Sequence, residues 1–330
     1  YQQPVGTGPF MWDSRVVGKS VTFKRNPNYW QAGKPYLDKV TWTFVTDDNT
    51  RELQLRGNQI QVNEFPPFNS IDKLENTPDV KMTLFPSTRT DYLVMNHNYK
   101  PLADVHVRRA ISYAIDRQAI VKAVLFGHGE PANSLLPPQV PFYDKNSPGI
   151  QYDMAKAKAE LQQSAYPNGF KVELLLGSGE QVQNQIGQIL QQVLKPLGIT
   201  ITFKTEDQST AFADIQAMKY QGLGFSYWTM DIADPDELVT FGVDSKTGGA
   251  HSFFTDWTNP QAVELSHQAQ KVEDPAKRQE LYSQIQKIAA DDAFMAFLYY
   301  SPFRYAYRSN VNGFVVYPLG NYHLEDVWLG

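Results

Sequence analysis

The first ninety residues alternate hydrophobic and polar positions over short stretches, which is the period of a half-buried strand. The alternation covers residues 21–25, 40–45 and 80–84. Turn-forming residues separate these stretches, at positions 26–29, 33–35 and 65–68. This pattern predicts a first segment that is mostly β-structure.

After residue 100 the hydrophobic period becomes that of a helix. Asp104 can cap a helix whose hydrophobic stripe contains positions 107, 111, 114 and 115. Asp116 can cap a second helix that runs through Ile120 and Val124. The two together predict a helical hairpin or a bent helix that packs on a core.

The middle of the chain alternates strand and helix patterns. We expect strands at 172–176, 199–204 and 224–227, and helices at 183–194 and 211–219. This alternation generates a parallel sheet, so the middle block is predicted to be α/β.

The last sixty residues return to β-structure after one helix. Asp274 and Pro275 supply an N-cap and a first-turn proline for that helix. Strands are then expected at 296–300, 304–307 and, after a turn at 311–313, at 314–317. A β-rich beginning and end suggest that both ends form one lobe and the middle forms another, with strands near 91–96 and 296–300 crossing between the lobes.

Composition narrows the class of protein. The chain has 330 residues, of which 42% are hydrophobic and 20% charged, which is enough for about two domains. A net charge of −5 gives no positive field for nucleic acid or an anionic membrane. The apolar run at 293–300 is far shorter than the ~20 residues of a membrane-spanning helix. Without cysteine there are no disulfides, thiolate zinc sites or cysteine nucleophiles.

The sequence carries no metal or cofactor signature. Its six histidines occur singly, with no pair spaced to place two imidazoles on one helix face. Neither a Gly-x-Ser-x-Gly elbow nor a phosphate-binding P-loop is present. We therefore expect neither a metal nor a cofactor.

The segment with the most candidate binding or catalytic side chains runs from residue 227 to 236, after the end of a predicted strand. It holds Tyr227, Trp228 and three carboxylates, Asp231, Asp234 and Asp236. A carboxylate pair can perform acid–base chemistry as in glycoside hydrolysis, and a carboxylate beside an aromatic ring can bind an ammonium group. In a third interpretation, Asp234 and Pro235 only start a helix.

A collinear series of motifs spans essentially the whole chain: Gly-Thr-Gly-Pro-Phe at 6–10, Phe-Lys-Arg-Asn-Pro-Asn-Tyr-Trp at 23–30, Gly-Lys-Pro-Tyr-Leu-Asp at 33–38, the run at 101–116, the run at 152–161 and Asp-Pro-Asp at 234–236. The series resembles the family 5 solute-binding proteins of ABC importers, the oligopeptide and dipeptide-binding group. The resemblance implies an α/β, two-lobed clamp like a periplasmic binding protein of class II type, with mixed sheets flanked by helices and two hinge strands. We expect residues 1–90 and 298–330 in the first lobe and 91–297 in the second.

The resemblance also implies site residues. Trp228 and Asp231 match the family's aromatic and the acid that pairs with the peptide α-ammonium, and Tyr300 lies near a position that contacts the peptide backbone. The other ligand-binding candidates are Arg89, Asp91, Tyr92, Gln181 and Tyr227. Arg89 could instead form a surface pair between strands, and Tyr300 could be a core ring. The loop at 177–183 lacks the arginine with which dipeptide binders hold the ligand carboxylate, which favours a longer peptide or a different ligand.

The predicted function is that of a non-enzymatic substrate-binding component of an ABC transporter. It would bind a peptide-like solute in the interlobe cleft and deliver it to the permease, as a monomer in the periplasm or anchored outside the membrane. The start at Tyr1 suggests a processed or excised piece that lacks the family's N-terminal part. The alternatives are an oligosaccharide-binding member of the family and a hydrolase that uses Asp231 with Asp234 or Asp236.

Overall fold

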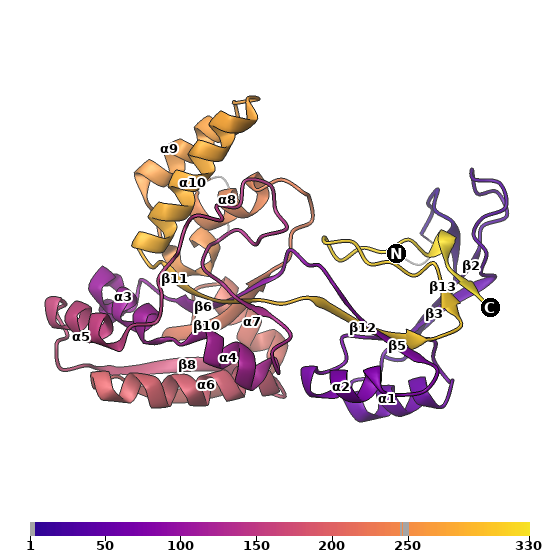
Figure 1. Cartoon of the computed structure of the whole chain (residues 1–330), viewed down its shortest axis with the longest axis horizontal. Coiled ribbons are helices and arrows are strands. Elements are labelled where there is room, and N and C mark those ends of the chain that lie inside the picture. The colour runs from indigo at the N-terminus through magenta and orange to yellow at the C-terminus, as the bar shows by residue number, and fades with distance from the viewer. Residues whose placement is uncertain (1–3, 245, 247–250) are drawn as a thin grey trace. The chain divides into compact units, whose positions relative to one another are not determined.

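The computed structural model describes residues 4–244, 246 and 251–330. Tyr1, on which the interpretation of an excised piece rests, lies outside them. The chain divides into two compact units, one of residues Tyr1–Pro86 and Pro302–Gly330 and one of residues Ser87–Ser301 (Figure 1). Each unit is described by itself. None of the described helices combines the length and the apolar character needed to cross a membrane.

The first unit contains short antiparallel sheets. One has the order β1 (Phe10–Val16), β2 (Ser20–Arg25), β3 (Lys39–Thr43), and another the order β4 (Val62–Glu64), β12 (Phe303–Arg308), β5 (Val80–Phe85). The short strands β13 (Val311–Asn312) and β14 (Trp328–Leu329) pair with each other. The predicted strands at 21–25, 40–45, 80–84 and 304–307 are thus confirmed with shifted ends.

Two features of the first unit differ from the prediction. Helices α1 (Asp48–Arg56) and α2 (Ile71–Glu75) lie in the segment expected to be mostly β. Asp47 caps α1 by accepting the Thr50 amide, and Leu55 and Leu74 are fully buried in one hydrophobic cluster. The strand expected at 314–317 is wrong, because only Val316 forms a bridge there.

The second unit is built on a six-stranded mixed sheet. Its order is β7 (Glu130–Pro131), β11 (Met295–Tyr300), β6 (Thr90–Met95), β10 (Gly222–Trp228), β8 (Lys171–Gly177), β9 (Thr200–Glu206). Strands β10, β8 and β9 are mutually parallel, whereas β6 is antiparallel to both β10 and β11. The predicted parallel arrangement is confirmed for the middle block.

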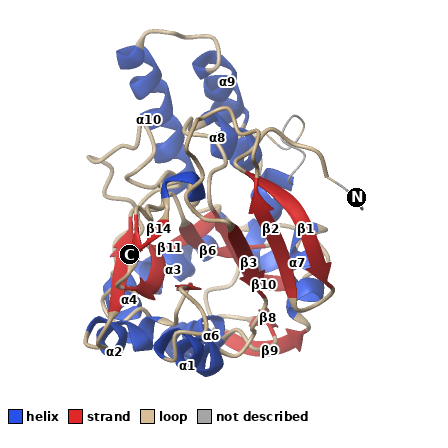
Figure 2. Cartoon of the chain, turned by 90° about the vertical axis from the view of Figure 1, so that its right-hand side faces the viewer, coloured by secondary structure: helices blue, strands red, loops and turns tan. Residues whose placement is uncertain are grey.

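Helices cover both faces of this sheet. They are α3 (Val105–Ala114), α4 (Arg117–Val124), α5 (Met154–Gln163), α6 (Gln181–Leu194), α7 (Gln208–Gln216), α8 (Asp236–Val243), α9 (Pro260–Ala269) and α10 (Pro275–Asp291). Asp104, Asp116 and Asp274 cap α3, α4 and α10 as predicted. Helices α6 and α7 pack on opposite faces, and α9 and α10 lie side by side (Figure 2).

The central strands β6 and β11 are buried along their whole length. They cover the segments at 91–96 and 296–300 that were expected to cross between the lobes, and here they pair with each other inside the second unit. The chain passes from one unit to the other at residues 86–87 and 301–302. All eight predicted ligand-binding residues therefore belong to the second unit.

Candidate functional site

The register of the sheet gathers most of these residues at one end. This carboxyl end, as we call it, is where β8, β9 and β10 finish. Tyr227 pairs with Asp91, and Trp228 pairs with Thr90, which on its other side pairs with Tyr300. Ligands of α/β proteins bind outside the carboxyl ends of parallel strands. The sheet thus brings three separate parts of the sequence to the place where a ligand is expected.

Arg89 and Asp91 form an ion pair at this end. The Arg89 Nε and Nη2 atoms donate to the two Asp91 carboxylate oxygens at 3.0 and 2.7 Å, and the Ser301 hydroxyl donates to one of them at 3.0 Å. The guanidinium lies 3.9 Å from the centre of the Tyr227 ring. Burial opposes the positive charge, but Asp91 outweighs it and raises the pKa of Arg89. Because Asp91 neutralises Arg89, the pair offers a polar surface and no free cation.

Asp231 has the opposite character. Its side chain is exposed, and no described residue forms a hydrogen bond or ion pair with its carboxylate. Its backbone is fixed, however, because the Asp231 amide donates to both oxygens of Glu237 at 3.2 and 3.0 Å. The turn therefore presents a carboxylate whose acceptors are open to a ligand.

Glu237 holds the rest of this turn as well. Its carboxylate accepts the Ile232 amide at 2.9 Å and the Trp228 indole N–H at 3.2 Å. Sequence reasoning missed Glu237, which is in the first turn of α8, nine residues beyond Trp228. The only available signal was an acidic side chain in the first turn of a helix, which also has a plain electrostatic explanation.

The Trp228 ring lies among other rings. Phe241 is 4.9 Å away in a tilted arrangement and Phe253 is 5.0 Å away edge to face, measured between ring centres. Tyr227 is about half exposed, with Arg89 over its ring. Phe241 and Phe253 thus pack against the Trp228 ring, and Arg89 lies over the Tyr227 ring.

The loop between β8 and α6 carries an acid in place of the missing arginine. Glu180 precedes α6 and accepts a hydrogen bond from Gln208 at 2.5 Å. Burial raises the pKa of Glu180, with Asp91 adding to the shift and Arg89 opposing it. Gln181, the first residue of α6, is exposed. This end of the sheet is therefore more acidic than basic.

Tyr92 and Tyr300 are placed differently from the other candidates. Tyr92 is fully buried and donates its hydroxyl to the Leu135 carbonyl at 3.1 Å. The Tyr300 hydroxyl accepts the amides of Asn133 and Ser134 at 3.3 and 3.1 Å, and burial raises its pKa well above the usual value. Both rings thus hold the segment at 133–135.

The two acids proposed as catalytic partners of Asp231 have structural contacts. Arg278 donates to both Asp234 oxygens at 3.0 Å each. Burial opposes ionisation of Asp234, but the hydrogen bonds from Arg278 outweigh it and lower its pKa. Asp236 accepts a hydrogen bond from Gln270 at 3.0 Å. A general acid needs a proton near neutral pH, so an Asp234 held ionised does not suit that role.

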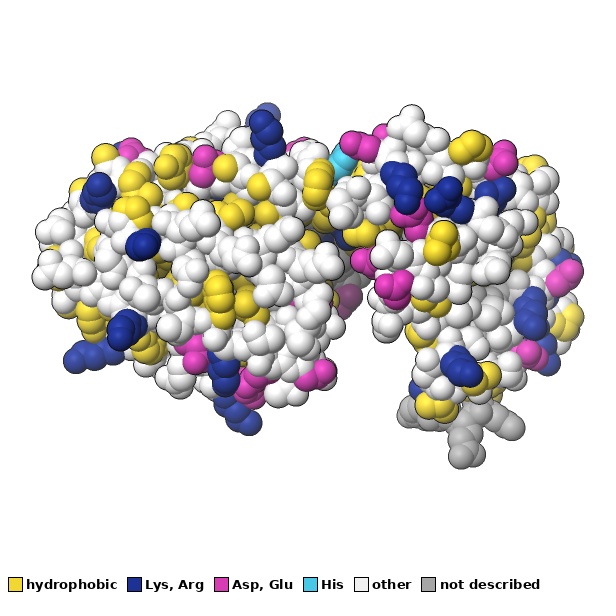
Figure 3. Space-filling model, turned by 90° about the horizontal axis from the view of Figure 1, so that it is seen from below, with side chains coloured by type: hydrophobic (Ala, Val, Ile, Leu, Met, Phe, Trp, Pro, Cys, Tyr) yellow, Lys and Arg dark blue, Asp and Glu magenta, His cyan; other side chains and the backbone are white. Residues whose placement is uncertain are grey.

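Charge and metal chemistry add little elsewhere. Lysines, arginines and acids are interspersed on the face seen in Figure 3. Among residues 4–244, 246 and 251–330, no group of three or more histidines and acids is placed to hold a metal ion. The carboxyl end of the sheet remains the best candidate site.

Comparison with known proteins decides the family. The family model of bacterial extracellular solute-binding proteins, family 5 (middle part), matches residues 1–250. The chain belongs to this family. Family 5 members are periplasmic or extracellular binding proteins rather than enzymes.

Individual family 5 relatives agree with this assignment. The glutathione-binding protein GsiB of Escherichia coli K12 is 30% identical over 329 residues, which cover 98% of this chain and 64% of GsiB. The chain thus spans somewhat less than two thirds of that relative's length. The periplasmic binding protein DppA of Helicobacter pylori, solved with the peptide STSA, is 27% identical with a TM-score of 0.87, covering 99% of this chain and 64% of DppA.

A further solved structure extends the range of bound peptides. The oligopeptide-binding protein AppA of Bacillus subtilis, in complex with a nonapeptide, is 25% identical with a TM-score of 0.85. The match covers 99% of this chain and 67% of AppA. These likenesses confirm the predicted family and the α/β fold of a family 5 binding protein.

Proposed function

We propose that this chain is part of a non-enzymatic, extracytoplasmic substrate-binding component of an ABC transporter. It binds a peptide-like solute at the carboxyl end of the second unit's sheet and delivers it to a membrane permease. Family membership supports this, as do relatives whose names describe binding of peptides and of glutathione. We propose further that it acts as a monomer outside the cytoplasmic membrane.

Asp231 is the observation that carries the proposal. A carboxylate without a partner, on a turn whose amides are already bound by Glu237, has both acceptors available for a cation. Peptides and glutathione share one cation, the α-ammonium group. A charge-assisted hydrogen bond between the two is stronger than a neutral one. We infer that Asp231 binds the ligand's amino group beside the Trp228 and Tyr227 rings.

Arg89, whose charge Asp91 neutralises, and the acidic loop at Glu180 indicate which part of the ligand lies at this end of the sheet. Neither provides a free cation for a ligand carboxylate, so the part of the solute that lies here is its amino-terminal part. The carboxylate of a longer peptide would lie away from this end of the sheet. This favours oligopeptides over dipeptides.

The test is a binding cycle by calorimetry with the peptide STSA and its N-acetylated form. Acetylation removes the ammonium charge, so the unmodified protein should bind the acetylated peptide about tenfold more weakly or worse. Asp231→Asn should weaken binding of the free peptide by a similar factor. The variant should no longer distinguish the two peptides, because each change removes the same interaction.

Asp256→Asn is the matched control. Asp256 is also exposed, but it follows Thr255, whose carbonyl accepts the His97 amide at the opposite end of β6. It should leave both affinities unchanged. If Asp231→Asn still prefers the free peptide tenfold, Asp231 does not bind the ammonium. Failure of STSA, glutathione and a random nonapeptide pool to bind the unmodified protein would overturn the proposed function itself.

A further inference from the structure

The segment at 251–254 follows a backbone path that side chains rarely adopt. His251, Ser252, Phe253 and Phe254 have φ values of 45, 38, 47 and 63°, which places four consecutive residues in the left-handed region. There the Cβ atom comes too close to the following carbonyl oxygen, so this region is unfavourable for any residue except glycine and most of all for a bulky one. We call this segment the left-handed turn.

Hydrogen bonds from residues next to β10 and β6 hold the left-handed turn. The Tyr220 hydroxyl donates to the Phe254 carbonyl at 2.7 Å, and the His97 amide donates to the carbonyl of Thr255, the next residue, at 2.9 Å. The Thr255 hydroxyl donates to the Ser252 carbonyl at 3.0 Å. A strained backbone persists only where its surroundings over-determine it, and such strain is concentrated at functional sites.

The left-handed turn places the ring of Phe253 against the sheet. This ring is fully buried, and its centre lies 5.0 Å from that of Trp228 and 5.4 Å from that of Tyr92, at interplanar angles of 83 and 84°. Tyr92 pairs with Ser226, two residues before Trp228, so both rings lie on the same face of the sheet. Edge-to-face contacts of this kind are a preferred geometry of aromatic pairs. Phe253 thus fixes Trp228 relative to Tyr92.

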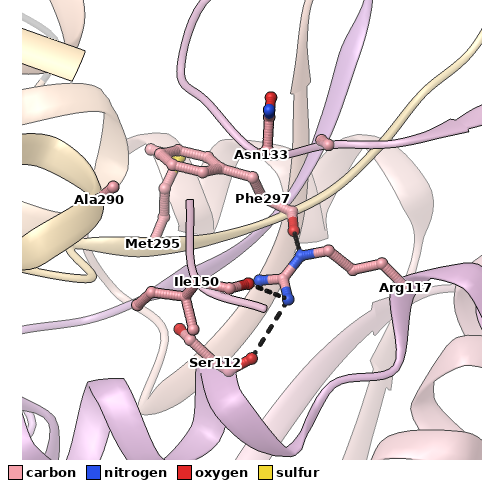
Figure 4. A pocket seen from close by; sticks show the side chains of 8 residues that line it. Ser112, Arg117, Asn133, Ile150, Ala290, Met295 and Phe297 are labelled. Atoms are coloured by element: carbon pink, nitrogen blue, oxygen red, sulfur yellow. Dashed lines mark hydrogen bonds between the residues drawn. The ribbon is translucent and has the colours of Figure 1, made fainter. Parts of the chain in front are cut away.

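Tyr92 is itself held from another side. Phe297 of β11 packs on the Tyr92 ring with the ring centres 6.0 Å apart, at an interplanar angle of 72°. Phe297 also borders a small cavity, shown in Figure 4, whose volume of ≈ 10 Å³ is room for about one water molecule. A side chain does not fit into this cavity, so the rings behind Phe253 have no room to shift into it.

Trp228 has two kinds of support. Glu237 accepts its indole N–H at 3.2 Å and Phe241 packs on its ring, and both of these residues belong to α8. Among the described residues, Phe253 is the one ring outside α8 that packs on Trp228. The Trp228 side chain remains partly exposed at the carboxyl end of the sheet. Its orientation there therefore depends on Phe253 as well as on α8.

We propose that Phe253 is a positioning residue for the ligand, and that the left-handed turn holds it against Trp228. This inference rests on the proposed function, in which the Trp228 ring lies beside the ligand's amino group. Phe253 is fully buried and acts only through Trp228, whose plane it fixes before the ligand arrives. A ring that is already fixed loses less freedom on association, so the peptide binds more tightly.

The experiment compares Phe253→Leu with Phe294→Leu. Phe294 is also fully buried and stacks on Trp257 with the ring centres 4.5 Å apart, and the Trp257 indole N–H donates to Asp292 at 3.1 Å. Each change removes a buried ring beside a tryptophan that an acid holds, so both should lower the unfolding temperature similarly. Only Phe253→Leu should weaken binding of STSA, by about fivefold to tenfold in calorimetry.

The indole N–H signals in ¹⁵N NMR spectra give a reading without peptide. In the unmodified, ligand-free protein, relaxation should show the Trp228 indole to be as rigid as that of Trp257. Phe253→Leu should broaden the Trp228 signal alone, and Phe294→Leu the Trp257 signal alone. Phe253→Met keeps a contact between sulfur and the rings, so it should retain a sharp Trp228 signal and bind STSA within about threefold of the unmodified protein.

Ser252 tests the left-handed turn separately. Glycine enters the left-handed region without strain and alanine does not, so Ser252→Gly should unfold about 3 °C above Ser252→Ala. The Ser252 hydroxyl has no partner among the described residues, and both variants lose it alike. Both keep the Phe253 ring and should bind STSA as the unmodified protein does.

Three results would overturn the positioning role. They are a Trp228 indole that is mobile in the free protein and becomes rigid only with STSA, unchanged STSA affinity in Phe253→Leu, and an equal loss of affinity in Phe294→Leu. The first needs no variant, so it decides even if Phe253→Leu does not fold. Ser252→Gly unfolding at or below Ser252→Ala would refute the left-handed turn as the support. Failure of the unmodified protein to bind any of the peptides tested would instead overturn the proposed function.

Discussion

Replacing Glu237 with alanine tests the geometry of the proposed binding turn most directly. The Glu237 carboxylate accepts hydrogen bonds from the Trp228 indole and from the amides of Asp231 and Ile232, over 2.9–3.2 Å. Side-chain truncation removes the acceptor for all three donors at once. No other described residue accepts a hydrogen bond from these three groups.

The free energy lost in Glu237→Ala depends on how exposed the three hydrogen bonds are. Hydrogen bonds to a charged acceptor contribute about 1.5–3 kcal/mol each when they are buried. Here Asp231 and Ile232 are exposed, so water replaces much of the loss, and the three bonds together should contribute about 2 kcal/mol to closing the turn. This corresponds to an equilibrium constant for opening of the turn that is about 30-fold larger.

Amide hydrogen exchange, measured by NMR, reports this opening at Asp231 and Ile232. In Glu237→Ala the amides of Asp231 and Ile232 should lose about 30-fold of their protection. Glu237→Gln should show a smaller loss, because its amide group keeps one acceptor oxygen. Glu264→Ala is the control, since Glu264 is a helical glutamate of the same unit that accepts a hydrogen bond from Gln268.

The reasoning is refuted if Glu237→Ala folds normally and both amides keep their protection. Peptide binding then gives an independent reading. A disordered turn should weaken binding of free STSA, because ordering the turn now opposes association. Normal exchange with lost binding would assign Glu237 to the ligand itself rather than to the turn.

Two further predictions concern the titration of buried groups. Burial, with the charge of Arg108, lowers the pKa of His97 from 6.5 to about 3, so the folded state keeps it neutral while the unfolded chain binds a proton below about pH 6.5. The free energy of unfolding should therefore decrease as the pH is lowered through that window. Between pH 7 and pH 5, urea unfolding should show that the unmodified protein loses about 2 kcal/mol more unfolding free energy than His97→Gln. Asp234→Asn should cost about 1 kcal/mol at pH 7, since Asp234 is partly exposed to screening. Because its folded pKa is lowered, that difference should shrink as the pH falls below about 4 and persist at neutral pH; a difference that grows in acid would contradict the ion pair with Arg278.

Local signals predicted much of the second unit. Asp104, Asp116 and Asp274 each precede a helix because a short acidic side chain accepts an amide of the first turn, and this chemistry needs no tertiary contact. The parallel strands follow from hydrophobic runs separated by helices. Trp228 and Asp231 are candidates from the sequence because strand, ring and acid are adjacent there.

The errors arise where tertiary packing decides. Helix α1 buries only Glu52 and Leu55, so its hydrophobic stripe is too sparse to see in the sequence. Phe314 and Val316 read as a strand, but they pack in a hydrophobic cluster and the segment lacks a full partner strand. Aromatic and β-branched residues satisfy either environment.

The site shows the same limit. Nothing in the sequence separates the fully buried ring of Tyr92 from the half-exposed ring of Tyr227, because both lie in hydrophobic strands. The difference depends on which segment covers each strand. The contact between Glu237 and the turn likewise depends on the path of the chain between them.

The way the second unit is inserted has a consequence for folding. Its two ends are joined, because β6 and β11 are neighbours and Ser301 contacts the backbone of Arg89 and the side chain of Asp91. Once this unit has folded, about 215 residues act as a short link between the two parts of the first unit. Closing a flexible loop of that length would otherwise cost about 5 kcal/mol in chain entropy. The folded second unit therefore acts as an internal cross-link of the first unit, and it lowers the chain-entropy cost of pairing β12 with β5.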